Sequence, residues 1–345
     1  MLVSLIVPNK NNAPVLGRFL DTLRRNTTYR DVELIVVDDG STDRSVDVLR
    51  RRRGTFERFE LVETRGGGIV NALNLAAERA RGEVIVRLDG DATIETRGWL
   101  ERMLAFRALS AKVGVVAAGV VFDSGRVHSY GMNVVSEAGV HSRGTVLLER
   151  PGARTLDIAV DYPPAADADG RDAPAEVDGA IGCCMLFERE LWERVGGFDS
   201  RYNPAGFEDF DFTLMARREG RKVFVLPEVE VVHRISRRNP REDVARRVML
   251  LYALRRKLGW IVPERARAAL AARARLGDSD PARIALLQRH YAYWREKWGF
   301  DPLNPDMREV LARWGGTEVC WAYDDEMRRE GEAIVNAFGR SPSSS

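Results

Sequence analysis

The chain has few cysteines, and none of them has a spacing typical of a metal or redox site. Its 345 residues include 3 cysteines, of which Cys183 and Cys184 are adjacent and Cys320 lies far from both. No CxxC pair is present, so the pattern predicts neither a disulfide framework nor a thiolate zinc finger. We expect a reducing, cytoplasmic setting.

Long apolar runs and one-sided charge are also absent. The opening "MLVSLIVPNK" has no basic start and meets Pro8 early, so it predicts a buried first strand and not a signal peptide. No run approaches the roughly 18 to 20 apolar residues that span a bilayer. The net charge of +2 demands no polyanionic partner, and no specific nucleic-acid module is found. Any membrane contact is therefore expected to be peripheral.

The first 90 residues alternate between short β-branched apolar runs and longer amphipathic runs. β-branched runs at 2–7, 32–37, 58–63 and 83–88 predict strands, and amphipathic runs at 15–25, 43–52 and 69–80 predict helices. Strands alternating with helices predict an α/β fold, with a mostly parallel sheet flanked by helices. Ligands of such sheets bind beyond the carboxyl ends of the strands.

The rest of the chain predicts less regular structure and then helices. We expect strands within 113–123, a hairpin at 125–136 and a long surface loop at 151–177, which could act as a lid. Apolar spacing predicts a helical C-terminal region from about 241, followed by a disordered "SPSSS" end. The arginine-rich stretch 234–257 fits a solvated helix face or a phosphate-binding surface. The predicted units are 1–235, 236–338 and 339–345.

Acidic pairs follow two of the predicted strands. "VVDDGSTD" places Asp38 and Asp39 after one strand, and "VRLDGDA" places Asp89 and Asp91 after another. Aspartate and glycine are also favoured in turns, so either pair alone fits a turn. Two carboxylates on either side of one glycine can instead hold a hard divalent cation and let a diphosphate approach it.

Three further features suit such a site. "RGGGIVNALN" approximates a dinucleotide fingerprint but follows the third strand and not the first, so flexible backbone near a phosphate explains its glycines as well. "GFEDFDF" supplies Glu208, Asp209 and Asp211 at a predicted helix start, where carboxylates favour the helix dipole or provide a general base. His233 ends the strand "EVEVVH", as a structural histidine or as a further ligand that suits Mn²⁺ better than Mg²⁺.

Together these motifs resemble the family 2 glycosyltransferases of the GT-A fold. The resemblance covers about 2–233 and rests on the order of "VSLIVPNKN", "LIVVDDGSTD", "ALNLAAERARGEVIVRLDGDA", "GCCMLFERELWERVGGFDSRY", "GFEDFDFTLMARREG" and "VLPEVEVVH". It implies a Rossmann-like, mostly parallel sheet and a metal-dependent, inverting enzyme of the hexosyltransferase type. The implied donor is a nucleoside-diphosphate sugar, with a UDP-sugar favoured over dTDP-sugars and GDP-mannose.

The resemblance also assigns roles to residues. Asp209 matches the general base that deprotonates an acceptor hydroxyl. The implied donor-nucleotide site consists of Pro8, Asn9, Asp39, Arg65 and Asp89, with Asp39 at the base. The implied metal ligands are Asp91, Asp89 and His233, for Mn²⁺ or Mg²⁺, and Glu208 and Gly182 lie on the implied acceptor side.

Two departures refine these expectations. Thr64 and Arg65 replace the asparagine that many relatives have before the glycine of the third-strand loop. The QxxRW motif and the membrane helices of processive synthases are absent, so we expect transfer of a single sugar. A saccharide, a lipid-linked acceptor or a protein would accept it, and a homo-oligomer fits the helical region. The alternatives are a sugar nucleotidyltransferase and a nucleotide-binding module without catalysis.

Overall fold

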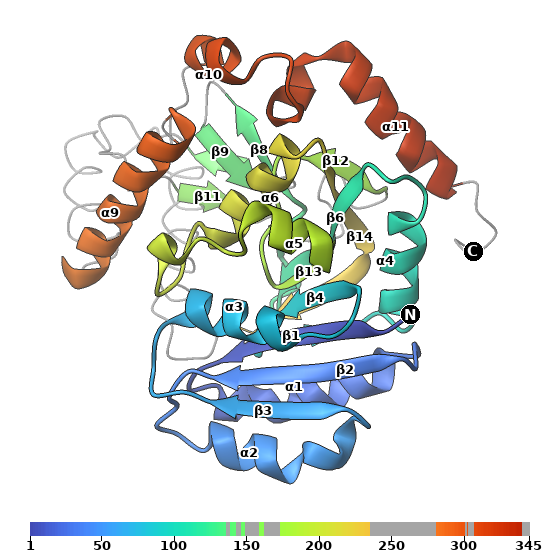
Figure 1. The fold of residues 1–345 in the computed structure, drawn as a ribbon, viewed down its shortest axis with the longest axis vertical. Helices are drawn as coiled ribbons and strands as arrows, with labels where there is room; N and C mark the ends of the chain where they lie inside the picture. Colours follow the sequence, from blue (N-terminus) through green and yellow to red (C-terminus); the bar gives the residue numbers. More distant parts are fainter. Residues whose placement is uncertain are drawn as a thin grey trace, which may run out of the picture.

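The computed structural model describes residues 1–135, 139–142, 146–148, 159–161, 173–234, 281–300, 302 and 307–339. Within these ranges a central sheet lies between layers of helices (Figure 1). The strands are β1 (Val3–Asn9), β2 (Val32–Asp38), β3 (Phe59–Glu63), β4 (Val84–Leu88), β5 (Ala92–Ile94), β6 (Val113–Phe122), β7 (Val127–Ser129), β8 (Met132–Val135), β9 (Gly139–Ser142), β10 (Val146–Leu148), β11 (Ala159–Asp161), β12 (Ala175–Val177), β13 (Cys184–Glu188) and β14 (Lys222–His233). The helices are α1 (Ala13–Asn26), α2 (Ser45–Arg51), α3 (Ile69–Arg79), α4 (Trp99–Arg107), α5 (Arg189–Val195), α6 (Glu208–Arg218), α9 (Pro281–Trp298), α10 (Met307–Trp314) and α11 (Asp325–Gly339), with short 3₁₀ turns η1 (Arg53–Thr55), η3 (Ser200–Tyr202) and η4 (Glu318–Tyr323).

The main sheet follows the order β12-β14-β6-β13-β4-β1-β2-β3, with β5 beside β14 and β7 beside β6. Strands β1 to β4 pair in parallel, as the alternating pattern predicts. β13 runs antiparallel between β4 and β6, so the sheet is mixed. The carboxyl ends of β1, β2 and β4 therefore meet at one edge, where the motifs lie.

Both faces of the sheet are buried, which explains why its strands are apolar without strict alternation. Leu5 and Val7 of β1 pack with α1 and α4 on one face, whereas Ile6 packs with α3, α5 and α6 on the other. The neighbouring strands continue the same division. A three-layer α/β/α arrangement results.

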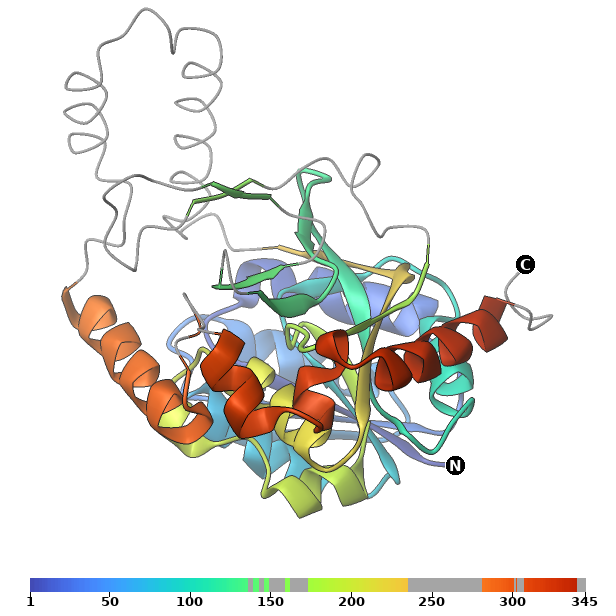
Figure 2. The ribbon, with the colours of Figure 1, turned by 90° about the horizontal axis from the view of Figure 1, so that it is seen from above.

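The C-terminal helices pack on this unit and lie around its outside (Figure 2). Trp294 and Trp298 of α9 are fully buried in a cluster with Tyr202 and Phe210. Phe338 of α11 joins the core beneath α4. The aromatic residues of this region therefore include core residues. Within the described residues, no helix combines the length and the apolar character needed to cross a bilayer.

Two local expectations were wrong. The hairpin expected at 125–136 does not form, because β7 pairs with β6 while β8 pairs with β9. Within the loop expected at 151–177, residues 159–161 form β11 and residues 175–177 form β12, which extends the main sheet beside β14. Residues 151–158 and 162–172 lie outside the described residues. The first part of the expected helical region, from 241 to 280, lies outside the described residues, as do the arginine-rich stretch beyond Arg234 and the tail after Gly339.

Candidate active site

Asp89 and Asp91 lie in the tight turn between β4 and β5, where the N–H of Ala92 donates to the carbonyl of Asp89 over 3.0 Å. β5 pairs with the end of β14, which places His233 opposite Ala92. The Nε2 atom of His233 therefore lies 3.4 Å from Oδ1 of Asp91. One ligand atom each from Asp89, Asp91 and His233 fall within 4.8 Å of one another. The aspartates therefore lie in a turn, and this turn also brings three metal-ligating groups together.

The donor set of this cluster fits a hard divalent cation. Two carboxylates and one imidazole suit Mn²⁺ or Mg²⁺. The Asp89 and Asp91 side chains are 24% and 23% exposed, so the cluster opens toward solvent on one side. A Cβ on Gly90 would lie 3.4 Å from Oδ1 of Asn9, an ordinary contact, so the fold itself tolerates a side chain there.

Asp39 connects the second strand to the glycine-rich loop. Its carboxylate accepts hydrogen bonds from Lys10 at 3.0 Å, from the Gly67 N–H at 2.6 Å and from the Gly68 N–H at 3.0 Å. Although burial opposes them, these donors hold the pKa of Asp39 below its usual value. The Gly67 and Gly68 N–H groups thus position an ionised carboxylate at the carboxyl end of β2. Neither the dinucleotide fingerprint nor a phosphate-binding loop predicts this role for the glycines.

The other predicted donor residues lie at the same edge. Asn9 is opposite Asp38 in the β1–β2 register, and its amide donates to the Asp38 carboxylate over 2.7 Å. Asp38 also accepts from the N–H and hydroxyl of Ser41, so it stabilises the turn. Pro8 is buried at the end of β1, whereas Arg65 is exposed in the loop after β3. The donor-binding roles of Pro8, Asn9 and Arg65 remain predictions.

The carboxylates of "GFEDFDF" separate into three environments at the start of α6. Glu208 is buried and accepts from Arg87 at 2.9 Å and from the Gly206 N–H at 2.6 Å. Asp211 accepts from Lys297 at 2.7 Å and from Trp298 at 2.9 Å, so it connects α6 to α9.

Asp209 is the one of these three carboxylates that no cation contacts directly in the described structure. It accepts from the Gly182 N–H at 3.0 Å and from the N–H of Phe210 at 2.8 Å. Burial, reinforced by the neighbouring Glu208, raises the pKa of Asp209 to about 6. A partly buried carboxylate with such a pKa is suited to accept a proton near neutral pH.

Arg87 joins these groups, and the sequence analysis missed it. Its side chain is 5% exposed, and Nη2 lies 2.9 Å from Glu208 and 3.6 Å from Asp89. Among the described residues its Nε and Nη1 atoms have no hydrogen-bond partner. A Cβ on Gly182 would lie 2.1 Å from Cζ of Arg87, so glycine is needed there. The signal was present as a single arginine inside the buried strand "EVIVRL".

Comparison with known proteins bears on the family and the fold of this chain. The profile of glycosyl transferase family 2 matches residues 4–196. Protein y4gI of Sinorhizobium fredii is 27% identical over 249 residues, covering 70% of this chain and 25% of that protein. The O-antigen biosynthesis protein RfbC of Myxococcus xanthus is 25% identical over 234 residues, covering 68% of this chain and 17% of that protein. The chain thus spans a quarter or less of these two relatives.

Among solved structures, the mannosyltransferase PcManGT of Pyrobaculum calidifontis, in complex with GDP-Man and Mn²⁺, superposes with a TM-score of 0.50 at 23% identity. The match covers 98% of this chain and 85% of that chain. At this identity the likeness supports the fold and not the substrate. It confirms the expected GT-A architecture.

Proposed function

This chain belongs to glycosyl transferase family 2, and on that premise we propose that it transfers one sugar from a nucleoside-diphosphate sugar to an acceptor hydroxyl with inversion. The observation that carries the proposal is the convergence of Asp89, Asp91 and His233 at the sheet edge. Arg87 links this cluster to the helix that bears Asp209, through its hydrogen bond to Glu208. A family fold alone would not specify a reaction.

In this proposal Asp39 and its neighbours bind the nucleoside. The Asp39 carboxylate already accepts the N–H groups of Gly67 and Gly68, so it is fixed in direction. A pyrimidine base could donate its imide N–H to such a carboxylate. We therefore favour a UDP-sugar. Because PcManGT binds GDP-Man, a GDP-sugar is the second donor to test.

Asp89, Asp91 and His233 would hold a divalent cation, Mn²⁺ in preference to Mg²⁺ because one ligand is an imidazole. Such a cation supplies charge neutralisation for the departing diphosphate. The Mn²⁺ in the PcManGT complex supports this assignment. The protein's own part is to keep two carboxylates and one imidazole within 4.8 Å of one another at the strand ends.

Asp209 acts as the general base. Its carboxylate is held by the N–H groups of Gly182 and Phe210, which leaves it to accept the proton of an acceptor hydroxyl. Attack of that hydroxyl on the face opposite the leaving group inverts the anomeric centre. Glu208 and Gly182 line the acceptor side in this proposal, with Glu208 also holding Arg87.

The acceptor is proposed to be a saccharide, a lipid-linked glycan or a protein. RfbC, an O-antigen biosynthesis protein, favours a saccharide. Residues 1–235 would form the catalytic unit, and the helical region 236–338 would shape the acceptor side or an oligomer interface. We keep the expected cytoplasmic location and peripheral membrane contact as part of this proposal.

One experiment separates the proposal from its alternatives. The full chain is incubated with Mn²⁺ and either UDP-, dTDP- and GDP-sugars or nucleoside triphosphates plus a sugar 1-phosphate. A glycosyltransferase releases nucleoside diphosphate from the first set, by slow hydrolysis or on addition of acceptor glycans. Pyrophosphate release from the second set would instead indicate a nucleotidyltransferase. Binding without either product would indicate a non-catalytic module.

A further inference from the structure

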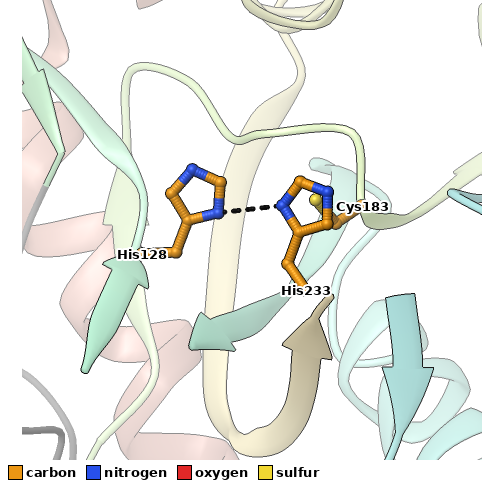
Figure 3. A group of neighbouring side chains, drawn as sticks. All are labelled: His128, Cys183 and His233. Carbon is orange, nitrogen blue, oxygen red and sulfur yellow. Dashed lines mark hydrogen bonds between the residues drawn. The ribbon is translucent and has the colours of Figure 1, made fainter. Parts of the chain in front are cut away.

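Three side chains beside the Asp89–Asp91 turn form a second cluster of metal-ligating groups. His128 comes from β7, Cys183 precedes β13, and His233 ends β14. One ligand atom each from these residues fall within 4.8 Å of one another. Figure 3 shows the two rings side by side, with the sulfur of Cys183 next to the ring of His233. None of the sequence motifs predicts this cluster, because its members are brought together only by strand pairing.

The distance between the two imidazoles matches a metal site. The Nδ1 atoms of His128 and His233 are 3.2 Å apart. Two imidazole nitrogens bound at about 2.0–2.1 Å to one tetrahedral zinc ion are about 3.3 to 3.4 Å apart. The two ring nitrogens could therefore bind one ion with little movement.

The chemistry of the three donors differs from that of the neighbouring carboxylate cluster. Two imidazoles and one thiolate favour a borderline-soft ion such as Zn²⁺ over Mn²⁺ or Mg²⁺. Cys183 is 3% exposed, and its thiol must lose its proton to act as a ligand. Metal binding would form the sulfur–metal bond and release that proton to solvent.

His233 belongs to both clusters through its two different nitrogens. Its Nε2 lies 3.4 Å from Asp91, while its Nδ1 faces His128. A neutral imidazole offers one lone pair, so His233 can ligate through only one nitrogen at a time. When Nδ1 binds a metal, the Nε2–H can donate to Asp91, which is the usual carboxylate–histidine–metal arrangement.

We propose that His128, Cys183 and His233 form a binding site for a soft divalent cation, Zn²⁺ being the best match, and that occupancy of this site removes His233 from the Asp89–Asp91 cluster. The existence of the soft site stands on the three residues alone. The competition rests on the proposed function, because it requires His233 to serve the hard cation. Zn²⁺ would then be an inhibitor and not the activating ion.

The arrangement without a metal is a ring stack closed by a hydrogen bond. His128 stacks on His233 with centroids 5.1 Å apart and on Phe122 with centroids 4.5 Å apart. Aromatic stacking alone would also explain why the two imidazole rings are nearly parallel, and it predicts no affinity for a metal ion. A direct binding measurement therefore decides between the two.

The test uses the full chain stripped of metal and titrated with Zn²⁺ alone against a chromophoric chelator, together with Co²⁺ spectra. We expect one Zn²⁺ to bind at least tenfold more tightly than Mn²⁺, and Co²⁺ to give a thiolate charge-transfer band. Cys183→Ser should remove that band and weaken Zn²⁺ at least tenfold, and His128→Ala should weaken Zn²⁺ similarly. Cys184→Ser is the matched control, because Cys184 lies in the core with its Sγ 3.9 Å from Sδ of Met103.

Unchanged Zn²⁺ affinity in both Cys183→Ser and His128→Ala would overturn the soft site. Melting curves confirm that each variant is folded, and His128→Ala decides the matter if Cys183→Ser is not. For the competition, Mn²⁺ binding is followed by electron paramagnetic resonance without any donor sugar. One equivalent of Zn²⁺ should weaken Mn²⁺ binding at least tenfold in the native chain and by a smaller factor in His128→Ala, where Zn²⁺ can compete only for the carboxylate cluster itself. Independent binding of the two ions would overturn the sharing of His233, whatever the activity of the enzyme.

Discussion

The guanidinium of Arg87 donates a 2.9 Å hydrogen bond to the carboxylate of Glu208, and both side chains are 5% exposed. This buried ion pair connects the strand that leads into Asp89 to the helix whose second residue is Asp209. This contact therefore helps to position the two halves of the proposed reaction, departure of the diphosphate and activation of the acceptor, relative to each other.

Loss of Arg87 should destabilise the fold strongly. Arg87→Met leaves the buried Glu208 carboxylate with the Gly206 N–H but no cationic partner, which costs roughly 3–5 kcal/mol in unfolding free energy. The double variant Arg87→Met with Glu208→Gln should recover most of that stability while activity stays low, because the strand that leads into Asp89 loses its ion pair with the helix that bears Asp209. Urea unfolding measures the first effect and turnover the second. Arg58→Met, which breaks the exposed pair with Asp31, is the control and should change little. Equal stability of Arg87→Met and the native chain would contradict the role of the pair.

Replacement of Asp209 should affect activity and stability in opposite directions. The reaction needs its ionised form, so kcat/KM should fall about tenfold per pH unit below about 6. Asp209→Asn should lower kcat by about 10²–10⁴. Because burial raises the pKa above its ordinary value of 3.8, ionisation costs stability as the pH rises through this range. Asp209→Asn should therefore become more stable relative to the native chain between pH 4 and pH 7. A variant that lost activity and also lost stability across this range would argue for a structural role.

Gly182 should tolerate no side chain. An added Cβ would lie 2.1 Å from Cζ of the buried Arg87, and either group must move. Gly182→Ala should lower both the melting temperature and turnover. Gly17 offers the control: it lies within α1 with no atom within 4 Å of an added Cβ, so Gly17→Ala should stabilise the protein by about 0.5–1 kcal/mol. Differential scanning fluorimetry compares the two, and equal effects would refute the packing argument.

Asp39 should control nucleotide affinity. In the native chain with Mn²⁺, the matching nucleoside diphosphate should raise the melting temperature as its concentration rises. Asp39→Ala should lose most of this shift, since the base would have no carboxylate to donate to. Asp43→Ala, in the same loop, removes hydrogen bonds from Ser45 and Ala13 and should lower stability while keeping the shift. A full shift in Asp39→Ala would place the base elsewhere.

The first half of the fold was accessible from the sequence because its interactions are local and periodic. The strands β1 to β4 and the helices between them lie within one or two residues of the predicted ranges at most ends. The strand ends then follow from parallel pairing, which brings Asn9, Asp38 and Asp39 to one edge.

Contacts between distant segments could not be derived from local patterns. The shared role of Asp89, Asp91 and His233 as metal ligands was implied by the family resemblance alone. β5 has three residues and pairs with β14, and only this pairing places His233 beside Asp91. The same holds for Lys10 on Asp39 and for His128 on His233. "GFEDFDF" was grouped as one acidic cluster, whereas the contact with Lys297 of α9 assigns Asp211 to packing. No local pattern encodes which carboxylate meets which cation.

The most direct measurement is nucleoside diphosphate release from the preferred sugar nucleotide, in Mn²⁺ and after chelation, by the native chain, Asp91→Ala, Asp209→Asn and the control Asp43→Ala. The proposed function predicts metal-dependent release that falls at least a hundredfold in Asp91→Ala and Asp209→Asn and persists in Asp43→Ala. Release that survives in both site variants, or that is indifferent to chelation, would contradict the assignment of these residues.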